Sequence, residues 1–139
     1  MKPYIWALMT ALVWGCVPVL EKLGLAKMPV LVGIFYRSFG VIIGMMLIVF
    51  FKFNLLKESL ANIPFGVFYL VVGGFLASVV GQIMFYHALQ GGEASKVVPL
   101  AASYPLISFL IGAIFLGESV TAAKLGGLFF IILGVILLK

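Results

Sequence analysis

Five long apolar runs, separated only by short polar breaks, constrain this chain more than any other feature of its sequence. The runs lie at about 4–20, 29–51, 64–89, 96–116 and 122–138, and several reach the roughly 20 residues that a helix needs to cross a bilayer. The composition agrees, because the chain is 65% hydrophobic and 9% charged, whereas soluble domains carry about 25% charged residues. We predict an all-α integral membrane protein with five transmembrane helices.

The breaks between the runs are rich in turn residues and charges, which end helices. Pro29 and Pro64 stand at expected helix starts, where a missing N–H group costs no hydrogen bond. No break is long enough to hold a soluble domain. We therefore expect one transmembrane domain that covers residues 1–139.

Small residues recur at four-residue spacing within the runs. In lipid, where packing drives helix association, such residues let two backbones approach closely. The pattern predicts tight helix–helix packing and says nothing about what the helices do. The residues concerned are Ala7, Ala11 and Gly15; Gly40 and Gly44; Gly73, Ala77 and Gly81; and Ala123 and Gly127.

The polar residues argue against several classes of function. The nine Lys and Arg residues are scattered, with no basic stripe of the kind that binds nucleic acid. A single cysteine, Cys16, and a single histidine, His87, leave no intrachain disulfide and no Cys- or His-rich metal site. The chain also lacks a Ser-His-Asp set and a carboxylate pair in the middle of any run, so we expect no enzyme, no metal and no cofactor.

The lysines are divided equally between the two sides of the predicted bundle. An excess of Lys and Arg in cytoplasmic loops normally sets orientation, and five crossings would place the termini on opposite sides. The balance predicts dual topology, in which oppositely inserted copies pair as an antiparallel homodimer with a ten-helix inverted repeat. The alternative is that the boundaries are shifted or that other features fix the orientation. Lys2, Lys52, Lys57 and Lys124 lie on the N-terminal side, and Lys22, Lys27, Lys96 and Lys139 lie on the other side.

Four segments in order carry a resemblance to a known family. They are "ALVWGCVPVLEK" (11–22), "YRSFG" (36–40), "YHALQGGEASKVVPLAASYPLISFLIGAIFLGES" (86–119) and "GGLFFIILGVIL" (126–137). The third is the most specific, with Tyr-x-Ala-Leu, a small-residue loop, two prolines and Leu-Gly-Glu. Together these segments resemble an EamA-type domain, the repeat unit of the drug/metabolite transporter superfamily.

The resemblance implies transport of small metabolites through a prokaryotic inner (cytoplasmic) membrane. Most relatives carry two such domains in one chain, and this sequence has one. A partner, most simply a second copy, is therefore implied. Kinship of fold does not name the cargo, the coupling ion or the direction of transport.

Arg37 is the clearest candidate for a functional residue, since it lies about nine residues into the second run, roughly 12 Å from its start. A charge inside a span usually faces a cavity or a partner. Its planar guanidinium could hold an anionic substrate group. Alternatively, its side chain reaches the membrane edge and meets Glu21 or Glu93. No acidic residue is expected in the middle of a span, which favours a neutral, zwitterionic or anionic substrate.

Other polar and aromatic side chains could line a substrate pathway. Gln82 and Tyr86 are four residues apart and share one helix face. Aromatic faces with a few polar donors suit a small organic substrate. The alternative is that these residues form interfacial belts or hydrogen bonds that glue helices together. The candidates are Trp14, Arg37, Gln82, Tyr86, Ser103 and Tyr104, with His87 as a possible titrating group or an interfacial structural residue.

Two prolines stand in the fourth run and are predicted to form a hinge or gate. With Ser95 as N-cap, Pro99 would lie close to the helix start, where little hydrogen bonding is lost. Pro105 lies deeper and removes the bond to the Ala101 carbonyl, which bends the helix. In lipid that carbonyl needs a new partner, so we predict a mobile, pathway-lining helix.

The favoured function is a small-molecule transporter subunit that works by alternating access. An alternative is a lipid or lipid-linked-sugar translocase subunit, with a cavity open sideways to the membrane lipid. A second alternative is an assembly subunit that transports nothing. The sequence leaves substrate, coupling and the choice between homodimer and heterodimer open.

Overall fold

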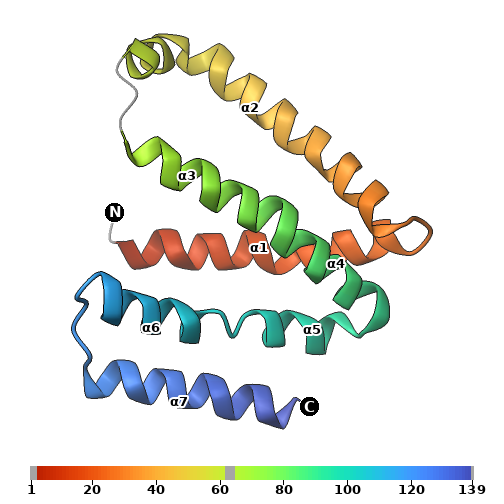
Figure 1. Ribbon diagram of the computed structural model, residues 1–139. Coiled ribbons are helices and arrows are strands. Elements are labelled where there is room, and N and C mark those ends of the chain that lie inside the picture. Colours follow the sequence, from red (N-terminus) through yellow and green to blue (C-terminus); the bar gives the residue numbers. More distant parts are fainter. Residues whose placement is uncertain (1–2, 62–64, 139) are drawn as a thin grey trace. The chain divides into compact units, whose positions relative to one another are not determined.

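The computed structural model describes residues 3–61 and 65–138, and in these ranges the chain forms helices joined by short turns (Figure 1). The helices group into five successive rods, which confirms the predicted all-α fold. The elements are α1 (Pro3–Leu25), α2 (Val30–Ala61), the rod of α3 (Gly66–Phe75), π-helical η1 (Leu76–Gly81) and α4 (Gln82–Gly91), the rod of α5 (Ala94–Ala101) and α6 (Pro105–Phe115), and α7 (Ala122–Leu137). Pro64, an expected helix start, lies outside the described residues.

Four of these rods are long and apolar enough to cross a membrane, among the residues that the structure describes. They cover Pro3–Leu25, Val30–Glu58, Gly66–Gly91 and Ala94–Phe115. The fifth, α7, is apolar but has 16 residues, or about 24 Å at 1.5 Å per residue. It is therefore the shortest of the five rods relative to a hydrocarbon core of roughly 30 Å.

The first helix continues past its expected end at residue 20. The segment "EKLGL" contains no proline and only one glycine, so nothing stops α1 before Leu25. Glu21 and Lys22 consequently lie inside the helix. The second helix also continues, but it kinks at Lys52, which has a non-helical φ of −127° and ψ of 28°. The expected end at residue 51 falls at this kink.

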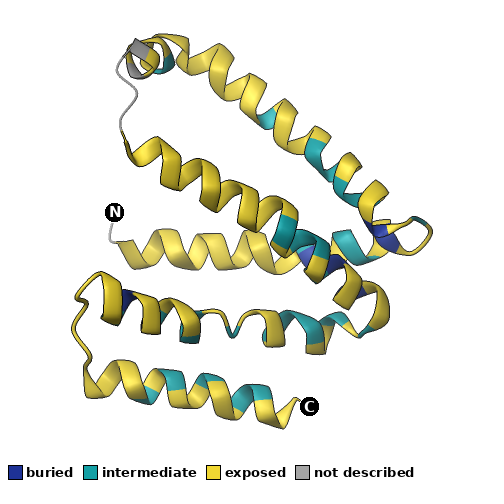
Figure 2. Ribbon diagram, in the orientation of Figure 1, coloured by how far each residue is buried: buried dark blue, intermediate teal, exposed yellow. Residues whose placement is uncertain are grey.

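The chain divides into two compact units, residues 1–90 and residues 91–139. In the first, unit 1, the buried apolar side chains gather where the turn between α1 and α2 meets α4 (Figure 2). Leu25, Val30, Tyr86 and Leu89 form this small core. The rest of α1, α2 and α3 presents mostly exposed apolar side chains, as expected of helices whose solvent is lipid.

Between the described residues of unit 1, the glycine stripes do not mark helix contacts, so the expected close packing is not found there. A Cβ added at Gly15, Gly40, Gly44, Gly73 or Gly127 would meet no atom within 4 Å. The reason in unit 1 is that α1 and α2 diverge from their connecting turn (Figure 1). Close approach occurs instead at Gly33, where a Cβ would lie 2.5 Å from Leu25 Cδ2.

The third rod contains a π-helical segment, η1, which ends immediately before Gln82. Such segments add residues to a turn and are frequent at functional sites. The added residue rotates the side chains that follow it relative to a continuous α-helix. In this way η1 sets the direction in which Gln82 and Tyr86 leave α4.

In unit 2, residues 91–139, the fourth rod is interrupted by a short turn at the point where Pro105 is predicted to bend it. Helix α5 ends at Ala101 and α6 begins at Pro105. The carbonyl of Ala101 accepts a bond from the Tyr104 N–H (3.3 Å). The carbonyl of Leu100 accepts bonds from Ser103 N–H (3.2 Å) and Oγ (2.7 Å). The turn thus supplies the new partners that the freed carbonyls need.

The expected start of the fourth helix is wrong by two residues. Glu93, with extended backbone angles, is the N-cap residue of α5, and Ser95 lies inside the helix. Pro99 therefore stands two residues deeper in the helix than predicted. Its ring removes the N–H group that would bond to the Ser95 carbonyl, although α5 continues across it.

The turn between α6 and α7 is closed by local bonds. Gly117 adopts a φ of 65°, a conformation that favours glycine, and this lets the Glu118 N–H reach the Gly112 carbonyl at 3.1 Å. Thr121 caps α7 by accepting a bond from the Lys124 N–H at 3.3 Å. Glu118 pairs with Lys124 at 3.7 Å.

Candidate functional site

A polar cluster centred on Glu21 lies at the buried end of unit 1. The Glu21 Oε1 atom accepts hydrogen bonds from Arg37 Nε at 3.2 Å, Gln82 Nε2 at 3.0 Å and the Tyr86 hydroxyl at 3.0 Å. The contact with Arg37 is also an ion pair. We call these four residues the Glu21 cluster, and it joins three different rods.

Local structure explains why these side chains converge. Glu21 stands in α1 one turn after Pro18, which is buried. Arg37 comes two turns into α2, beyond the close approach at Gly33. Gln82 and Tyr86 are four residues apart on one face of α4.

The cluster is shielded but not sealed. The side chain of Glu21 is 11% exposed and that of Arg37 is 32% exposed, while Tyr86 as a whole is 2% exposed. Taking charges out of water is costly unless they are paired and hydrogen-bonded. Within the described part of the chain, no buried side-chain nitrogen or oxygen lacks a hydrogen-bond partner. Glu21 and Arg37 are therefore paired and hydrogen-bonded, as charged side chains inside a membrane span need to be.

A pocket of about 290 Å³ opens beside the cluster. Both members of the ion pair line it, so its wall carries a carboxylate and a guanidinium. The remainder is apolar or aromatic, a composition typical of small-molecule sites. The lining residues are Leu20, Glu21, Gly24, Leu25, Met28, Gly33, Tyr36, Arg37 and Tyr86.

A second set of bonds ties the end of α4 to the turn between α1 and α2. Lys22 Nζ donates to the Leu89 carbonyl at 2.8 Å. Gln90 Nε2 donates to the carbonyls of Leu25 at 3.2 Å and Met28 at 2.8 Å. We call these contacts the end clamp, because they hold the same end of unit 1 that contains the cluster.

The structure brings three of the predicted site residues together: Arg37, Gln82 and Tyr86. It also places Glu21 at their centre, whereas the sequence predicts that the first helix ends at residue 20 and that no acid lies within a span. Pro18, Lys22 and Leu25 follow one another at spacings of four and three residues, which is the spacing of one face of a continued helix. Arg37 does meet Glu21, as one of its two interpretations required.

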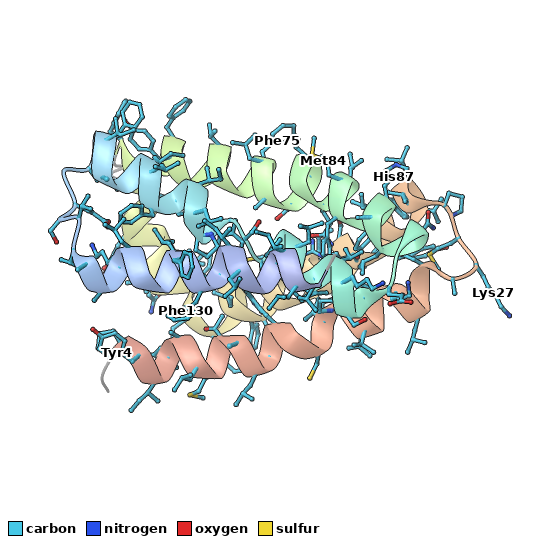
Figure 3. All side chains as sticks on the ribbon, turned by 90° about the horizontal axis from the view of Figure 1, so that it is seen from below. Tyr4, Lys27, Phe75, Met84, His87 and Phe130 are labelled. Atoms are coloured by element: carbon cyan, nitrogen blue, oxygen red, sulfur yellow. The ribbon has the colours of Figure 1, made fainter. Side chains whose placement is uncertain are left out.

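The other candidates stand apart from the cluster or in unit 2. Trp14 is exposed on α1. Ser103 bonds to the Leu100 carbonyl within its own turn, and Tyr104 is exposed. Figure 3 shows His87 on the side of α4 that points away from α1, and the residue is exposed. Their roles, and those of Pro99 and Pro105 as a hinge, stay predictions.

The part of the chain that the structure describes contains no cluster of metal-ligating side chains. No group of three or more His, Cys, Asp or Glu side chains gathers there in a way that could hold an ion. Cys16 is exposed, and its thiol faces the Leu12 carbonyl one turn before it at 3.6 Å. What the cluster can do is bind and orient a small polar molecule.

Comparison with known proteins agrees with this architecture. The model of the EamA-like transporter family matches residues 1–139. An uncharacterized protein of Methanocaldococcus jannaschii is 28% identical over 135 residues, which span 97% of this chain and 94% of the relative. No solved structure matches. The chain is therefore a multi-pass integral membrane protein that belongs to the EamA-like transporter family.

Proposed function

We propose that this chain is a transporter subunit for a small metabolite, with the Glu21 cluster as part of its substrate site. The observation that carries the proposal is a hydrogen-bonded ion pair, Glu21–Arg37, inside membrane-spanning helices and beside a pocket. Ionisable residues within spans usually mark substrate or ion pathways. No enzymatic activity is part of the proposal.

A second copy inserted in the opposite direction would complete the transporter. The equal division of lysines gives no preferred orientation, and two inverted five-helix copies make the layout of many transporters. The glycines at 15, 40 and 44 face open space within the described residues, which leaves room for a close helix from a partner. The matched relative is also of single-unit length, since the match covers 94% of it.

Alternating access would then open each end of the dimer in turn. The end clamp and the Glu21 cluster close one end of unit 1 through bonds between α4 and the α1–α2 region. The inverted copy would present the same closure at the other face. The break before Pro105 supplies a flexible point in the fourth rod. We place the protein in a prokaryotic inner membrane.

The first test reconstitutes the purified chain in liposomes and measures uptake of a metabolite mixture by mass spectrometry. We expect flux of at least one small neutral, zwitterionic or anionic compound, lost in Arg37→Gln and kept in Glu118→Gln, a control in unit 2. No flux of any compound would favour an assembly subunit. Movement of labelled lipid in place of metabolites would favour a translocase.

The second test addresses orientation. Replacing Cys16 with serine leaves a cysteine-free chain, into which single cysteines can be placed near either terminus. An impermeant thiol reagent applied to intact cells should label a fraction of both variants. Labelling of one terminus only would show a single orientation and would exclude the antiparallel homodimer.

A further inference from the structure

The hydrogen bonds to Glu21 leave one of its oxygens unused. All three donors, from Arg37, Gln82 and Tyr86, end on Oε1. Across residues 3–61 and 65–138, no group donates to Oε2. An ionised carboxylate offers about four acceptor sites over its two oxygens, so Oε2 keeps the capacity to hold a donor, including a charged one.

Arg37 keeps unused groups in the same way. It contacts Glu21 through Nε at 3.2 Å, and within the described ranges its two terminal nitrogens make no hydrogen bond. Every buried side-chain nitrogen or oxygen in these ranges has a hydrogen-bond partner. Because the two terminal nitrogens of Arg37 have none, they must be accessible from outside the protein. The planar guanidinium can therefore still hold an anionic group with two parallel bonds.

Both unused groups belong to residues that line the pocket of about 290 Å³. That space is roughly ten times the volume that one water occupies in the liquid, about 30 Å³, so its ligand is small. Tyr36 and Tyr86 also line it, and an aromatic face attracts a cation. The acceptor and the donors lie within the reach of one small molecule, since an ion pair already joins their parent groups.

The charges of the pocket select among ligand classes. The pair carries one negative and one positive charge, so the site is neutral before the ligand arrives. A simple anion would face the carboxylate of Glu21, and a simple cation would face the guanidinium of Arg37. In either case a net charge would be buried, which is costly. A zwitterion meets both groups and leaves the site neutral.

We infer that the pocket beside Glu21 and Arg37 binds a small zwitterion. The anionic group of the ligand bonds to the terminal nitrogens of Arg37, and its cationic group bonds to Oε2 of Glu21. The inference rests on the proposed transport function and deepens it by naming the class of the cargo.

Matched triads of ligands test this inference on the full-length purified chain in lipid nanodiscs. Each triad contains a zwitterion, the same molecule without its ammonium group, and the same molecule without its carboxylate. Suitable triads are alanine, propionate and ethylamine; leucine, 4-methylpentanoate and 3-methylbutylamine; and phenylalanine, 3-phenylpropionate and phenethylamine. Affinities come from thermal shift and from isothermal calorimetry.

In the wild-type protein, the zwitterion of at least one triad should bind at least tenfold more tightly than the other two compounds of that triad. Each of those compounds leaves either Glu21 or Arg37 without an oppositely charged group. Glu21→Gln should invert this preference toward the carboxylate-only compound, since Arg37 then stands alone. Arg37→Gln should invert it toward the amine. Glu118→Gln should leave the preference unchanged, and retained melting temperatures identify the variants that still fold.

A merely structural pair would weaken all three ligands together and would not invert the preference. Equal binding of the three members in every triad, or no binding of any zwitterion, would overturn the inference. If metabolite uptake occurs in liposomes without a zwitterion preference, the inference fails alone. If zwitterions bind but no compound is transported, the proposed function fails and the binding site stands.

Discussion

Among the described residues, unit 1 holds a carboxylate–guanidinium pair and unit 2 holds two carboxylate–ammonium pairs, and their surroundings are very different. In unit 1, the carboxylate of Glu21 meets Arg37 at 3.2 Å and is 11% exposed. In unit 2, Glu118 meets Lys124 at 3.7 Å with the acid 56% exposed, and Glu93 meets Lys96 at 3.7 Å with the acid 71% exposed.

The difference lies in what else touches each carboxylate. Glu21 has two further donors from a separate rod, so its position is fixed by tertiary structure. The unit 2 pairs lie three and six residues apart in sequence and need only local structure. Exposed pairs contribute about 0–1 kcal/mol, whereas breaking a shielded pair leaves an uncompensated charge. We therefore expect stability and function to depend on the first pair far more than on the others.

Loss of the guanidinium should have the largest effect on stability. Arg37→Ala leaves the Glu21 carboxylate without its counter-charge, and we expect a loss of about 2–3 kcal/mol, below the cost of a fully buried pair because Arg37 is partly exposed. Thermal unfolding in detergent measures it. Lys124→Ala is the matched control in unit 2 and should change stability by less than about 0.5 kcal/mol. Equal losses would remove the distinction between the two regions.

Crowding the close approach beside the cluster should cost slightly less. In Gly33→Ala, the new methyl group would lie 2.5 Å from Leu25 Cδ2, so the buried Leu25 side chain must repack against Tyr86 at a cost of about 1–3 kcal/mol. Gly40→Ala in the same helix meets no atom within 4 Å and should be neutral or stabilising, because alanine favours helix. The melting temperatures of the two variants are compared. An unchanged melting temperature in Gly33→Ala would argue against the close contact between Gly33 and Leu25.

Removing one donor from Glu21 should have a smaller effect. Tyr86→Phe keeps the buried ring and deletes only the hydroxyl that bonds to Oε1, for an expected loss of about 1–2 kcal/mol. Tyr36→Phe, an exposed neighbour of the same pocket, is the stability control. Chemical denaturation of both variants checks the ranking, and it would be contradicted if Tyr36→Phe lost as much stability as Tyr86→Phe.

The smallest effect is expected at the exposed acids of unit 2. Glu118→Gln keeps the side-chain shape beside Gly112 and removes only an exposed ion pair, so stability should change by less than about 0.5 kcal/mol. The small difference should shrink further at high salt, which screens exposed charges. A loss above 1 kcal/mol that persists in salt would place this acid in the same class as Glu21.

The sequence predicted features that depend on residue chemistry within one helix. The interruption at Pro105 follows from a missing N–H group and a ring clash, and it needs no knowledge of neighbouring helices. The apolar runs likewise predict five helices because membrane thickness sets their length. Arg37, Gln82 and Tyr86 stood out as polar residues in apolar surroundings.

Features that depend on contacts between rods could not be predicted in the same way. Charged residues usually end a span, so the sequence predicts Glu21 outside the first helix, yet its partners in α2 and α4 make the continuation of α1 favourable. The π-helical segment Leu76–Gly81 has no sequence signature that separates it from an ordinary helix. The glycine stripes predict close packing but do not say with which helix, and the partner of those at 15, 40 and 44 is not found within unit 1.

The most direct test of the central claim, that the shielded pair forms part of a substrate site, is uptake by proteoliposomes containing Arg37→Lys. Lysine keeps the positive charge and can still pair with Glu21, but it cannot hold an anionic group with a planar, two-pronged donor. We predict a folded variant whose apparent affinity for the transported metabolite is about tenfold weaker or worse. Uptake with unchanged apparent affinity would show that Arg37 serves structure alone.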